Sequence, residues 1–167
     1  MSTTSNKIMD AAKMEAVVKR LAFQIYESNV SNKKVVIAGI AKNGLLLAEE
    51  LCTHLGAISN LEVSCVAIIM DKKNPMHSLT TDTPLEQLKN ESVVIVDDVL
   101  NTGKTLIHAV HHFLSVPLTQ LQTAVMVNRN HKKYPIKADF KGLSLSTSLK
   151  EHVEVEMKGA KKGVYLT

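Results

Sequence analysis

The sequence predicts an α/β fold in which a parallel sheet is flanked by helices. Two predicted strands, residues 34–40 and 93–96, consist almost entirely of apolar residues, many of them β-branched, and are typical of strands buried on both faces. Each run leads into a short polar turn and then into a segment with helical spacing of apolar residues. Near the C-terminus, residues 153–158 alternate between apolar and charged side chains, which indicates a small antiparallel element beside the main sheet.

The N-terminal part is expected to consist of a frayed end and a helix. Residues 1–7 are rich in Ser and Thr, which favours fraying. From Ile8 to about Ser28 apolar side chains recur at helical spacing, so an amphipathic helix is predicted there. The next elements are expected to be a strand, a loop, a helix and a second strand, over residues 34–40, 41–44, 45–55 and 61–70.

A long polar segment, residues 71–90, lies in the middle of the chain. It carries Pro75 and Pro84, and a loop of this length in a compact domain is uncommon unless it has a function. We therefore expect it to be flexible. The elements after it are predicted to be a strand, a helix, a strand, a basic loop that enters a short strand, and a hairpin, over residues 93–96, 106–114, 121–127, 128–142 and 153–166.

Length and composition indicate a single domain over residues 1–167, with a core of ordinary size. The hydrophobic fraction of 45% and the charged fraction of 22% are those of a soluble globular protein. The formal charge of +4 suits an anionic ligand or an RNA surface, and the absence of Trp argues against stacking platforms for single-stranded nucleic acid. No secretory signal pattern and no apolar run near ~18 residues is found. We expect a cytoplasmic protein with neither a membrane nor DNA as a partner.

The two cysteines, Cys52 and Cys65, stand apart in the sequence within apolar stretches. Such residues are most often buried free thiols. A zinc or redox site would need closer or more numerous partners, so we expect neither here.

The stretch 92–105 contains the residues that most clearly indicate a functional site. Asp97 and Asp98 follow the predicted strand, and residues 101–105 form a small polar turn before the next helix. A turn of Thr and Gly at a helix start offers backbone N–H donors to a phosphate, and Gly103 lets the backbone approach it closely. Two adjacent carboxylates make sense if they face hydroxyls, or Mg²⁺ with its water shell. The alternative is that both Asp residues cap the helix.

The run VVIVDDVLNTGKTL resembles the phosphoribosyl pyrophosphate (PRPP) signature of type I phosphoribosyltransferases, which has a hydrophobic strand, two acids and then T-G-[KR]-T. The resemblance implies that Asp97 and Asp98 are catalytic, that they hold the ribose hydroxyls of PRPP, and that Mg²⁺ is the cofactor, held by the same pair through those hydroxyls or water. It implies that the 5′-phosphate is bound by Asn101, Thr102, Gly103, Lys104 and Thr105.

The same resemblance gives two other segments a role. The loop after the first strand would contact the pyrophosphate of PRPP, through Ala41, Lys42, Asn43 and Gly44. In a parallel sheet it lies at the same carboxyl edge as the signature, although an ordinary turn with a solvated Lys42 is the alternative. Segment 71–90 corresponds to the family's catalytic hood, which excludes water. Lys72 and Lys73 are its candidates for reaching the pyrophosphate, and a solvated pair of charges is the alternative.

Within this family the segment after the fourth strand resembles the pyrimidine-operon attenuator and uracil phosphoribosyltransferases of the bifunctional PyrR type. The matching residues are Arg129, His131, Pro135, Ile136, Ala138, Asp139, Gly142, Thr147 and Ser148. The resemblance implies base binding by Ile136, Lys137 and Arg129, and for Ile136 a core contact is an equal alternative. It implies transfer of ribose 5-phosphate from PRPP to a base, with uracil expected first.

Three other functions stay open. One is a purine phosphoribosyltransferase acting on hypoxanthine or guanine, and another is a degenerate relative that binds nucleotides without turnover. A third is an RNA-binding attenuator, in which the first helix would present Lys19, Arg20 and Phe23 to RNA. Only Arg20 matches the family at those places. The expected partners are PRPP, a nucleobase and further copies of the chain in a homodimer or a higher homo-oligomer, because the resemblance implies dimers.

Overall fold

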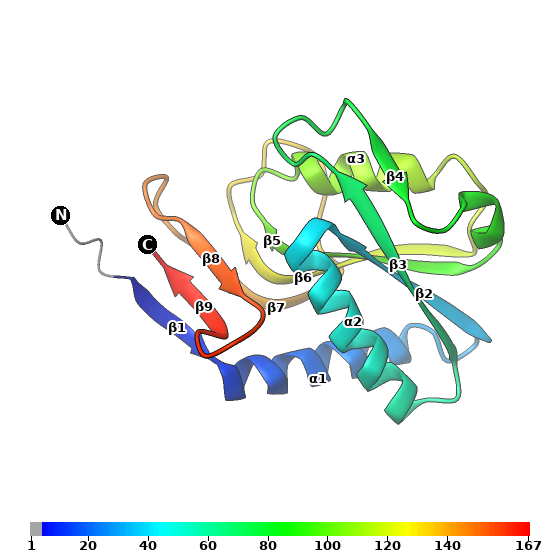
Figure 1. Ribbon diagram of the computed structural model, residues 1–167, viewed down its shortest axis with the longest axis horizontal. Helices are drawn as coiled ribbons and strands as arrows, with labels where there is room; N and C mark the ends of the chain where they lie inside the picture. The colour runs from blue at the N-terminus through cyan, green and yellow to red at the C-terminus, as the bar shows by residue number, and fades with distance from the viewer. Residues whose placement is uncertain (1–4) are drawn as a thin grey trace.

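The computed structural model describes residues 5–167 and confirms the α/β fold, with a six-stranded sheet in the order β4-β3-β2-β5-β6-β7 (Figure 1). Five of these strands, β3, β2, β5, β6 and β7, run parallel, and β4 is an antiparallel edge strand. The strands are β2 (Lys34–Ile40), β3 (Glu62–Met70), β4 (Leu79–Thr81), β5 (Ser92–Leu100), β6 (Gln120–Arg129) and β7 (Phe140–Leu145).

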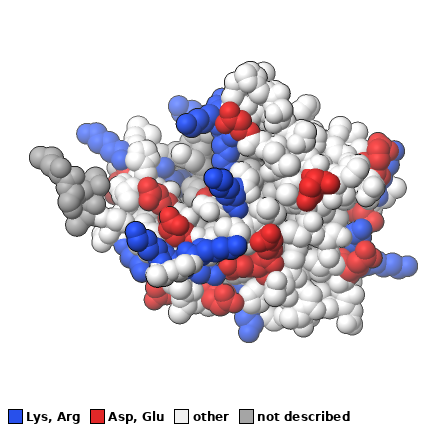
Figure 2. Space-filling view, viewed as in Figure 1, with Lys and Arg blue, Asp and Glu red and all other residues white. Residues whose placement is uncertain are grey.

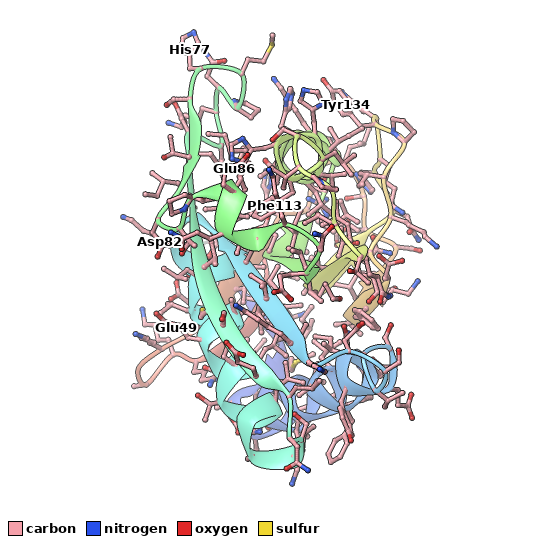
Figure 3. All side chains as sticks on the ribbon, turned by 90° about the vertical axis from the view of Figure 1, so that its right-hand side faces the viewer. Glu49, His77, Asp82, Glu86, Phe113 and Tyr134 are labelled. Atoms are coloured by element: carbon pink, nitrogen blue, oxygen red, sulfur yellow. The ribbon has the colours of Figure 1, made fainter. Side chains whose placement is uncertain are left out.

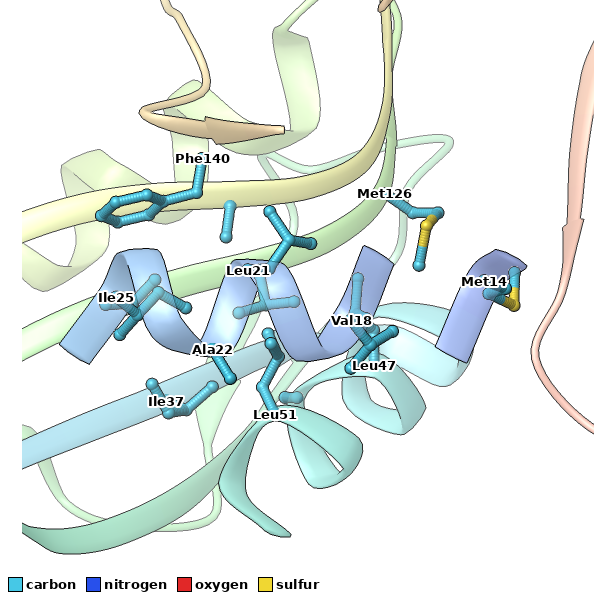
Figure 4. Close-up of a cluster of buried hydrophobic side chains, with 14 of the residues drawn as sticks. Met14, Val18, Leu21, Ala22, Ile25, Ile37, Leu47, Leu51, Met126 and Phe140 are labelled. Atoms are coloured by element: carbon cyan, nitrogen blue, oxygen red, sulfur yellow. The ribbon is translucent and has the colours of Figure 1, made fainter. Parts of the chain in front are cut away.

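Helices cover both faces of this sheet. Successive strand residues point to opposite sides, so each central strand packs against helices on both faces. The helices are α1 (Ala11–Glu27), α2 (Ala41–Ile58), α3 (Lys104–Phe113) and the 3₁₀ helix η1 (Leu85–Leu88). Val35 and Ile37 of β2 pack with α1 and α2 in one core, part of which is shown in Figure 4. Val36 and Ala38 pack on the opposite face with α3 and η1. The β-branched runs are therefore buried on both faces, as predicted.

A second sheet joins the two ends of the chain. It has three antiparallel strands in the order β1-β9-β8, namely β1 (Asn6–Asp10), β8 (Val153–Glu156) and β9 (Gly163–Leu166). The predicted C-terminal hairpin with β8 at its edge is confirmed. Figure 1 shows this sheet beside the main one, with β1 and β9 adjacent.

The N-terminal prediction is wrong in two respects. Residues 6 and 7 are part of β1 and are not frayed, and the helix begins at Ala11 rather than Ile8; residues 1–4 lie outside the described part. Asp10 ends the strand and caps the helix by accepting a hydrogen bond from the N–H of Lys13 at 2.8 Å. Pairing with β9, more than 150 residues away, outweighs the local helical spacing at Ile8 and Met9.

Three further boundaries differ from the sequence predictions. Residues 41–44, expected as a loop, are the first turn of α2. Strand β5 continues to Leu100, so Asp97 and Asp98 lie within it and not beyond its end. Segment 71–90 contains β4 and η1, which leaves residues 71–78 as its longest irregular part.

Charge and exposure complete the description of the surface. Basic and acidic side chains are interspersed on the face shown in Figure 2, without a large area of one sign. Cys52 is half-buried, but Cys65 is exposed, so the prediction of two buried thiols is wrong for Cys65. Within residues 5–167 no helix has the length and apolarity needed to cross a membrane.

Candidate functional site

The candidate site lies where the connections of the sheet change direction. From β2 the chain continues through α2 to β3 on one side, and from β5 it continues through α3 to β6 on the other side. Strands β2 and β5 are neighbours, so α2 and α3 both begin beside the same crevice at the carboxyl edge of the sheet. In open α/β sheets, ligands bind in the crevice at such a switch point.

An acidic pair forms the floor of this crevice. Asp97 and Asp98 lie near the carboxyl end of β5, and their side chains are only 4% and 15% exposed. The N–H of Asp98 donates to Oδ1 of Asp97 at 2.9 Å, and the N–H of Val99 donates to Oδ1 of Asp98 at 2.8 Å. Both carboxyls are thus held in place by the backbone of their own strand.

Lys72 provides a cation for the acidic pair. Its Nζ lies 2.8 Å from Oδ1 of Asp97 and 3.3 Å from Oδ1 of Asp98. The contact brings the start of segment 71–90 down to the crevice, whereas the tip of this segment, marked by His77 in Figure 3, projects beyond the sheet. Lys73 is exposed and contributes its backbone N–H to Asp71. Of the two lysines proposed for this segment, the structure brings Lys72 to the site.

The ionisation of the acidic pair is uneven. Burial is the main influence on Asp97 and raises the pKa of its carboxyl to about 7, against the attraction of Lys72. Burial would also raise the pKa of Asp98, but Lys72 and hydrogen bonds from Asn43 and Val99 outweigh it and hold that pKa below its usual value. Burial opposes the charge of Lys72 too, yet the two carboxyls raise its pKa. Asp98 is therefore the anionic partner of Lys72, and Asp97 titrates near neutrality.

The predicted 5′-phosphate segment forms a cradle at the start of α3. Gly103 precedes the helix with a φ of 87°, in the left-handed region, and no side chain caps the helix. Residues 101–106 enclose a cavity of about 50 Å³ together with Asp97 and Val125. The carbonyl of Thr102 accepts hydrogen bonds from the N–H groups of Lys133 and Tyr134, at 2.8 and 3.1 Å, so the 131–136 segment supports the cradle. The uncapped N–H groups suit an anion.

The predicted pyrophosphate segment lies on the other side of the acidic pair. No side chain caps α2, and its first turn carries the exposed Lys42. The side chain of Asn43 donates to Oδ2 of Asp98 at 3.0 Å and to the carbonyl of Val155 in β8 at 2.9 Å. A Cβ at Gly44 would lie 2.8 Å from the carbonyl oxygen of Val96. Only a glycine therefore lets α2 start this close to β5.

The three residues proposed to bind the base occupy different surroundings. Ile136 packs under the cradle, where a Cβ on Gly103 would overlap its Cγ2. Lys137 is 80% exposed with its Nζ 3.7 Å from Oδ1 of Asp139, and it lines a cleft of about 350 Å³ with Ile136 beside α3. Arg129 is buried, and its Nε donates to Oγ1 of Thr147 at 3.0 Å.

Another cleft is connected to the cradle through Lys133, whose N–H donates to the carbonyl of Thr102. It measures about 500 Å³ and is lined by residues 130–133 and 147–149, of which Leu149 is 85% exposed. Arg129 supports this cleft from below, because its NH2 group donates to the carbonyl of Glu151 at 2.7 Å. A larger cleft of about 700 Å³, between residues 75–79 and the outer side of α3, has no lining residue in common with the cradle.

Asn128 is a candidate that the sequence analysis missed. It is 4% exposed in β6, between Leu100 of β5 and Ser144 of β7 in the strand register, and its Oδ1 has no hydrogen-bond partner among residues 5–167. A buried polar atom without a partner is unfavourable unless a ligand or water satisfies it. The only sequence signal is an amide residue at the end of an apolar strand, which is too weak to identify a site.

Known proteins resemble this chain over most of its length. The model of the phosphoribosyl transferase domain family matches residues 4–159. The bifunctional protein PyrR of Citrifermentans bemidjiense is 32% identical over 164 residues, which cover 93% of this chain and 92% of the relative, and that of Limosilactobacillus reuteri is 29% identical over 164 residues, with 92% of each covered. A hypoxanthine-guanine phosphoribosyltransferase structure from Bacillus anthracis has a TM-score of 0.77 at 17% identity, with 97% of this chain and 96% of that one covered.

Proposed function

The chain belongs to the phosphoribosyl transferase family, and from that premise we propose that it transfers ribose 5-phosphate from PRPP to a ring nitrogen of a nucleobase, most readily uracil. In this reaction the base nitrogen forms a bond to C1′ of the ribose and loses its proton. The bond from C1′ to pyrophosphate breaks, and both electrons leave with the pyrophosphate. The fold is that of the type I phosphoribosyltransferases.

One observation carries the proposal, namely that two uncapped helix starts flank a buried acidic pair. PRPP has a phosphate at one end, a pyrophosphate at the other and ribose hydroxyls between them. The start of α3, residues 101–105, suits the 5′-phosphate, and the start of α2, residues 41–44, suits the pyrophosphate. Asp97 and Asp98 between them then face the hydroxyls, as hydrogen-bond acceptors.

The acidic pair also fits Mg²⁺. Lys72 places a positive charge across both carboxyls, which supports a cation as the partner of this pair. Mg²⁺ commonly uses one or two carboxylates and completes its shell with water and substrate phosphates, so Asp97 and Asp98 suffice on the protein side. When bound, Mg²⁺ neutralises charge that develops on the leaving pyrophosphate. Within residues 5–167 no cluster of three or more His, Cys, Asp or Glu offers another metal site.

Lys72 has two successive roles in this proposal. In the ligand-free protein it offsets the charge of the acidic pair, which would otherwise be buried without a partner. When PRPP and Mg²⁺ occupy the crevice, Lys72 is displaced. It lies at the start of segment 71–90, from which it reaches the pyrophosphate and stabilises the charge that forms there. The exposed Lys73 is the weaker candidate for this contact.

We place the base in the cleft formed by residues 130–133 and 147–149. This cleft adjoins the 5′-phosphate cradle, because the Lys133 N–H is bonded to Thr102. Arg129 positions the 147–151 wall, and the buried Asn128, whose amide oxygen is unpaired within residues 5–167, precedes it in β6. Ile136 supports the cradle from below, and Lys137 lies beside the neighbouring cleft. Uracil is the first candidate because the matched relatives are named bifunctional PyrR.

The RNA-binding alternative receives less support. Arg20 is the one residue of α1 that matches the family's RNA-contacting positions, and its NH2 group donates to the carbonyl of Gly142 at 2.7 Å. Its guanidinium therefore ties α1 to β7.

We propose that the protein is cytoplasmic and forms a homodimer. Light scattering of the purified chain will test whether it is a dimer.

The decisive experiment is pyrophosphate release from PRPP and Mg²⁺ with uracil, hypoxanthine, guanine, adenine or orotate. Release with uracil alone is expected, release with a purine would establish the purine alternative, and silence with every base would refute transfer. Lys72→Met and Lys73→Met form a matched pair. The first is expected to reduce turnover by roughly 10²-fold, as for the loss of one charge-stabilising group, and the second by much less. Equal effects would refute the role of Lys72.

A further inference from the structure

Cys52 and Cys65 form a thiol pair that the sequence did not reveal. Val63 of β3 packs against the core under α1 and α2, whereas Val66 packs on the opposite face. Side chains alternate along a strand, so Cys65 shares the α2 side with Val63. On α2, Cys52 follows the buried Leu51 and packs against the same core. Helix α2 packs directly on β3, so Cys52 and Cys65 lie in the same layer between helix and strand, and each thiol shifts the pKa of the other.

The two thiols are unequal. Interaction with Cys65, together with burial, raises the pKa of the Cys52 thiol. The same interaction lowers the pKa of Cys65, against burial and the negative charges of Glu49 and Asp82. Figure 3 labels these two acids on the β3 side of the molecule. Cys65 is exposed and Cys52 is half-buried. The exposed thiol with the lower pKa is the more reactive one.

We propose that Cys52 and Cys65 are a redox-active pair that forms a reversible intramolecular disulfide between α2 and β3 when a hydroperoxide oxidises the exposed Cys65. The structure puts the attacking thiol at the surface and the resolving thiol behind it. This arrangement differs from that of an isolated exposed cysteine, which has no second thiol in the same chain to convert its sulfenic acid into a disulfide. The proposal does not depend on the transferase reaction.

The chemistry balances in two steps. The Cys65 thiolate attacks one oxygen of the hydroperoxide, the O–O bond breaks, and the other oxygen leaves with the electron pair and takes a proton. For hydrogen peroxide the products are a sulfenic acid on Cys65 and water. The Cys52 sulfur then attacks the Cys65 sulfur, the S–O bond breaks, and the hydroxide leaves as water with the Cys52 proton. Two thiols and one peroxide become one disulfide and two waters.

The pair lies well away from the proposed transferase site. Cys65 stands five residues before Met70, which corresponds to about 17 Å along the strand. Cys52 stands eight residues after Gly44, about 12 Å along the helix. Substituting either cysteine should therefore leave PRPP binding intact, so that redox chemistry and transfer can be tested separately.

The test uses the full chain treated with hydrogen peroxide and then analysed by intact mass and by peptide mapping without reduction. We expect loss of two hydrogen atoms, a peptide pair linked through Cys52 and Cys65, no free thiols, and full recovery with dithiothreitol. Before oxidation, Cys65 should alkylate with iodoacetamide roughly tenfold or more faster than Cys52. Thermal unfolding of the oxidised chain is expected at a higher temperature than that of the reduced chain, because the link closes a loop between α2 and β3.

Single variants make the assignment specific. Cys52→Ser should stop at a Cys65 sulfenic acid that dimedone traps, and Cys65→Ser should resist the same peroxide dose. Circular dichroism of both reduced variants reports whether each one folds. The proposal is overturned if the oxidised wild-type chain retains both thiols, if it forms only a dimer linked through Cys65, or if Cys65 proceeds to sulfinic acid without engaging Cys52.

Discussion

Replacing Asp97 by Asn should make the ligand-free protein more stable at alkaline pH while it weakens PRPP binding. The carboxyl of Asp97 is buried, and burial raises its pKa to about 7. The folded protein therefore holds this proton at pH values where the unfolded chain has already lost it. Ionising Asp97 opposes folding, and the stability that its proton provides is lost as the pH rises toward the folded pKa. An amide of the same shape does not ionise.

The magnitude follows from the two pKa values of Asp97, 3.8 in the unfolded chain and about 7 in the folded protein. By linkage, ionisation of this group opposes folding by about 1.7 kcal/mol at pH 5 and by about 4 kcal/mol at pH 8. The Asn variant avoids this increase. Relative to the wild type, its free energy of unfolding should therefore rise by about 2.5 kcal/mol from pH 5 to pH 8. For a chain of this size that corresponds to a shift in Tm of about 5–10 °C.

The assay is urea unfolding of both proteins at several pH values between 5 and 8, without PRPP or Mg²⁺. Asp98→Asn is the matched control, because the pKa of Asp98 is lowered in the folded state. The ionised form of Asp98 stabilises the fold at every pH above its unfolded pKa. The control should thus lose stability over the whole range. A stability difference between wild type and Asp97→Asn that does not change with pH would refute the reasoning.

Three other experiments, two of them with a paired variant, test the packing around the site. Gly44→Ala should destabilise the protein by roughly 1–3 kcal/mol in thermal unfolding, because its Cβ would lie 2.8 Å from a β5 carbonyl oxygen. Gly56→Ala, in open space on the same helix, should stabilise the protein by roughly 0.5–1 kcal/mol. Equal effects of the two substitutions would contradict the close approach of α2 to β5. Gly103→Ala should lower PRPP affinity in calorimetry, and Ile136→Ala in the same chain should restore only part of it, because the left-handed φ remains; full recovery would show that crowding alone matters. Arg129→Lys should increase hydrogen exchange in residues 147–151, because it removes the guanidinium donors to that segment, and unchanged protection would refute that role.

The sequence determined those features that depend on neighbouring residues. Continuous β-branched runs are stable only as strands covered on both faces, so β2 and β5 could be recognised without a structure. The turn at Gly103 needs a left-handed residue before a helix, which again is a local requirement. The segments at the carboxyl edge, including the acidic pair, could be proposed as one site because each follows a strand of a parallel sheet and because the second resembles the PRPP signature.

Only the tertiary structure decided which distant residues meet. The pairing of β1 with β9, the contact of Lys72 with Asp97 and the approach of Cys52 to Cys65 all join segments that no local period connects. The spacing of apolar residues along a helix or strand shows which side of the element a residue occupies, but it does not show what covers that side. Burial of Asp97 and exposure of Cys65 follow from that covering, and so do their pKa values and their chemistry.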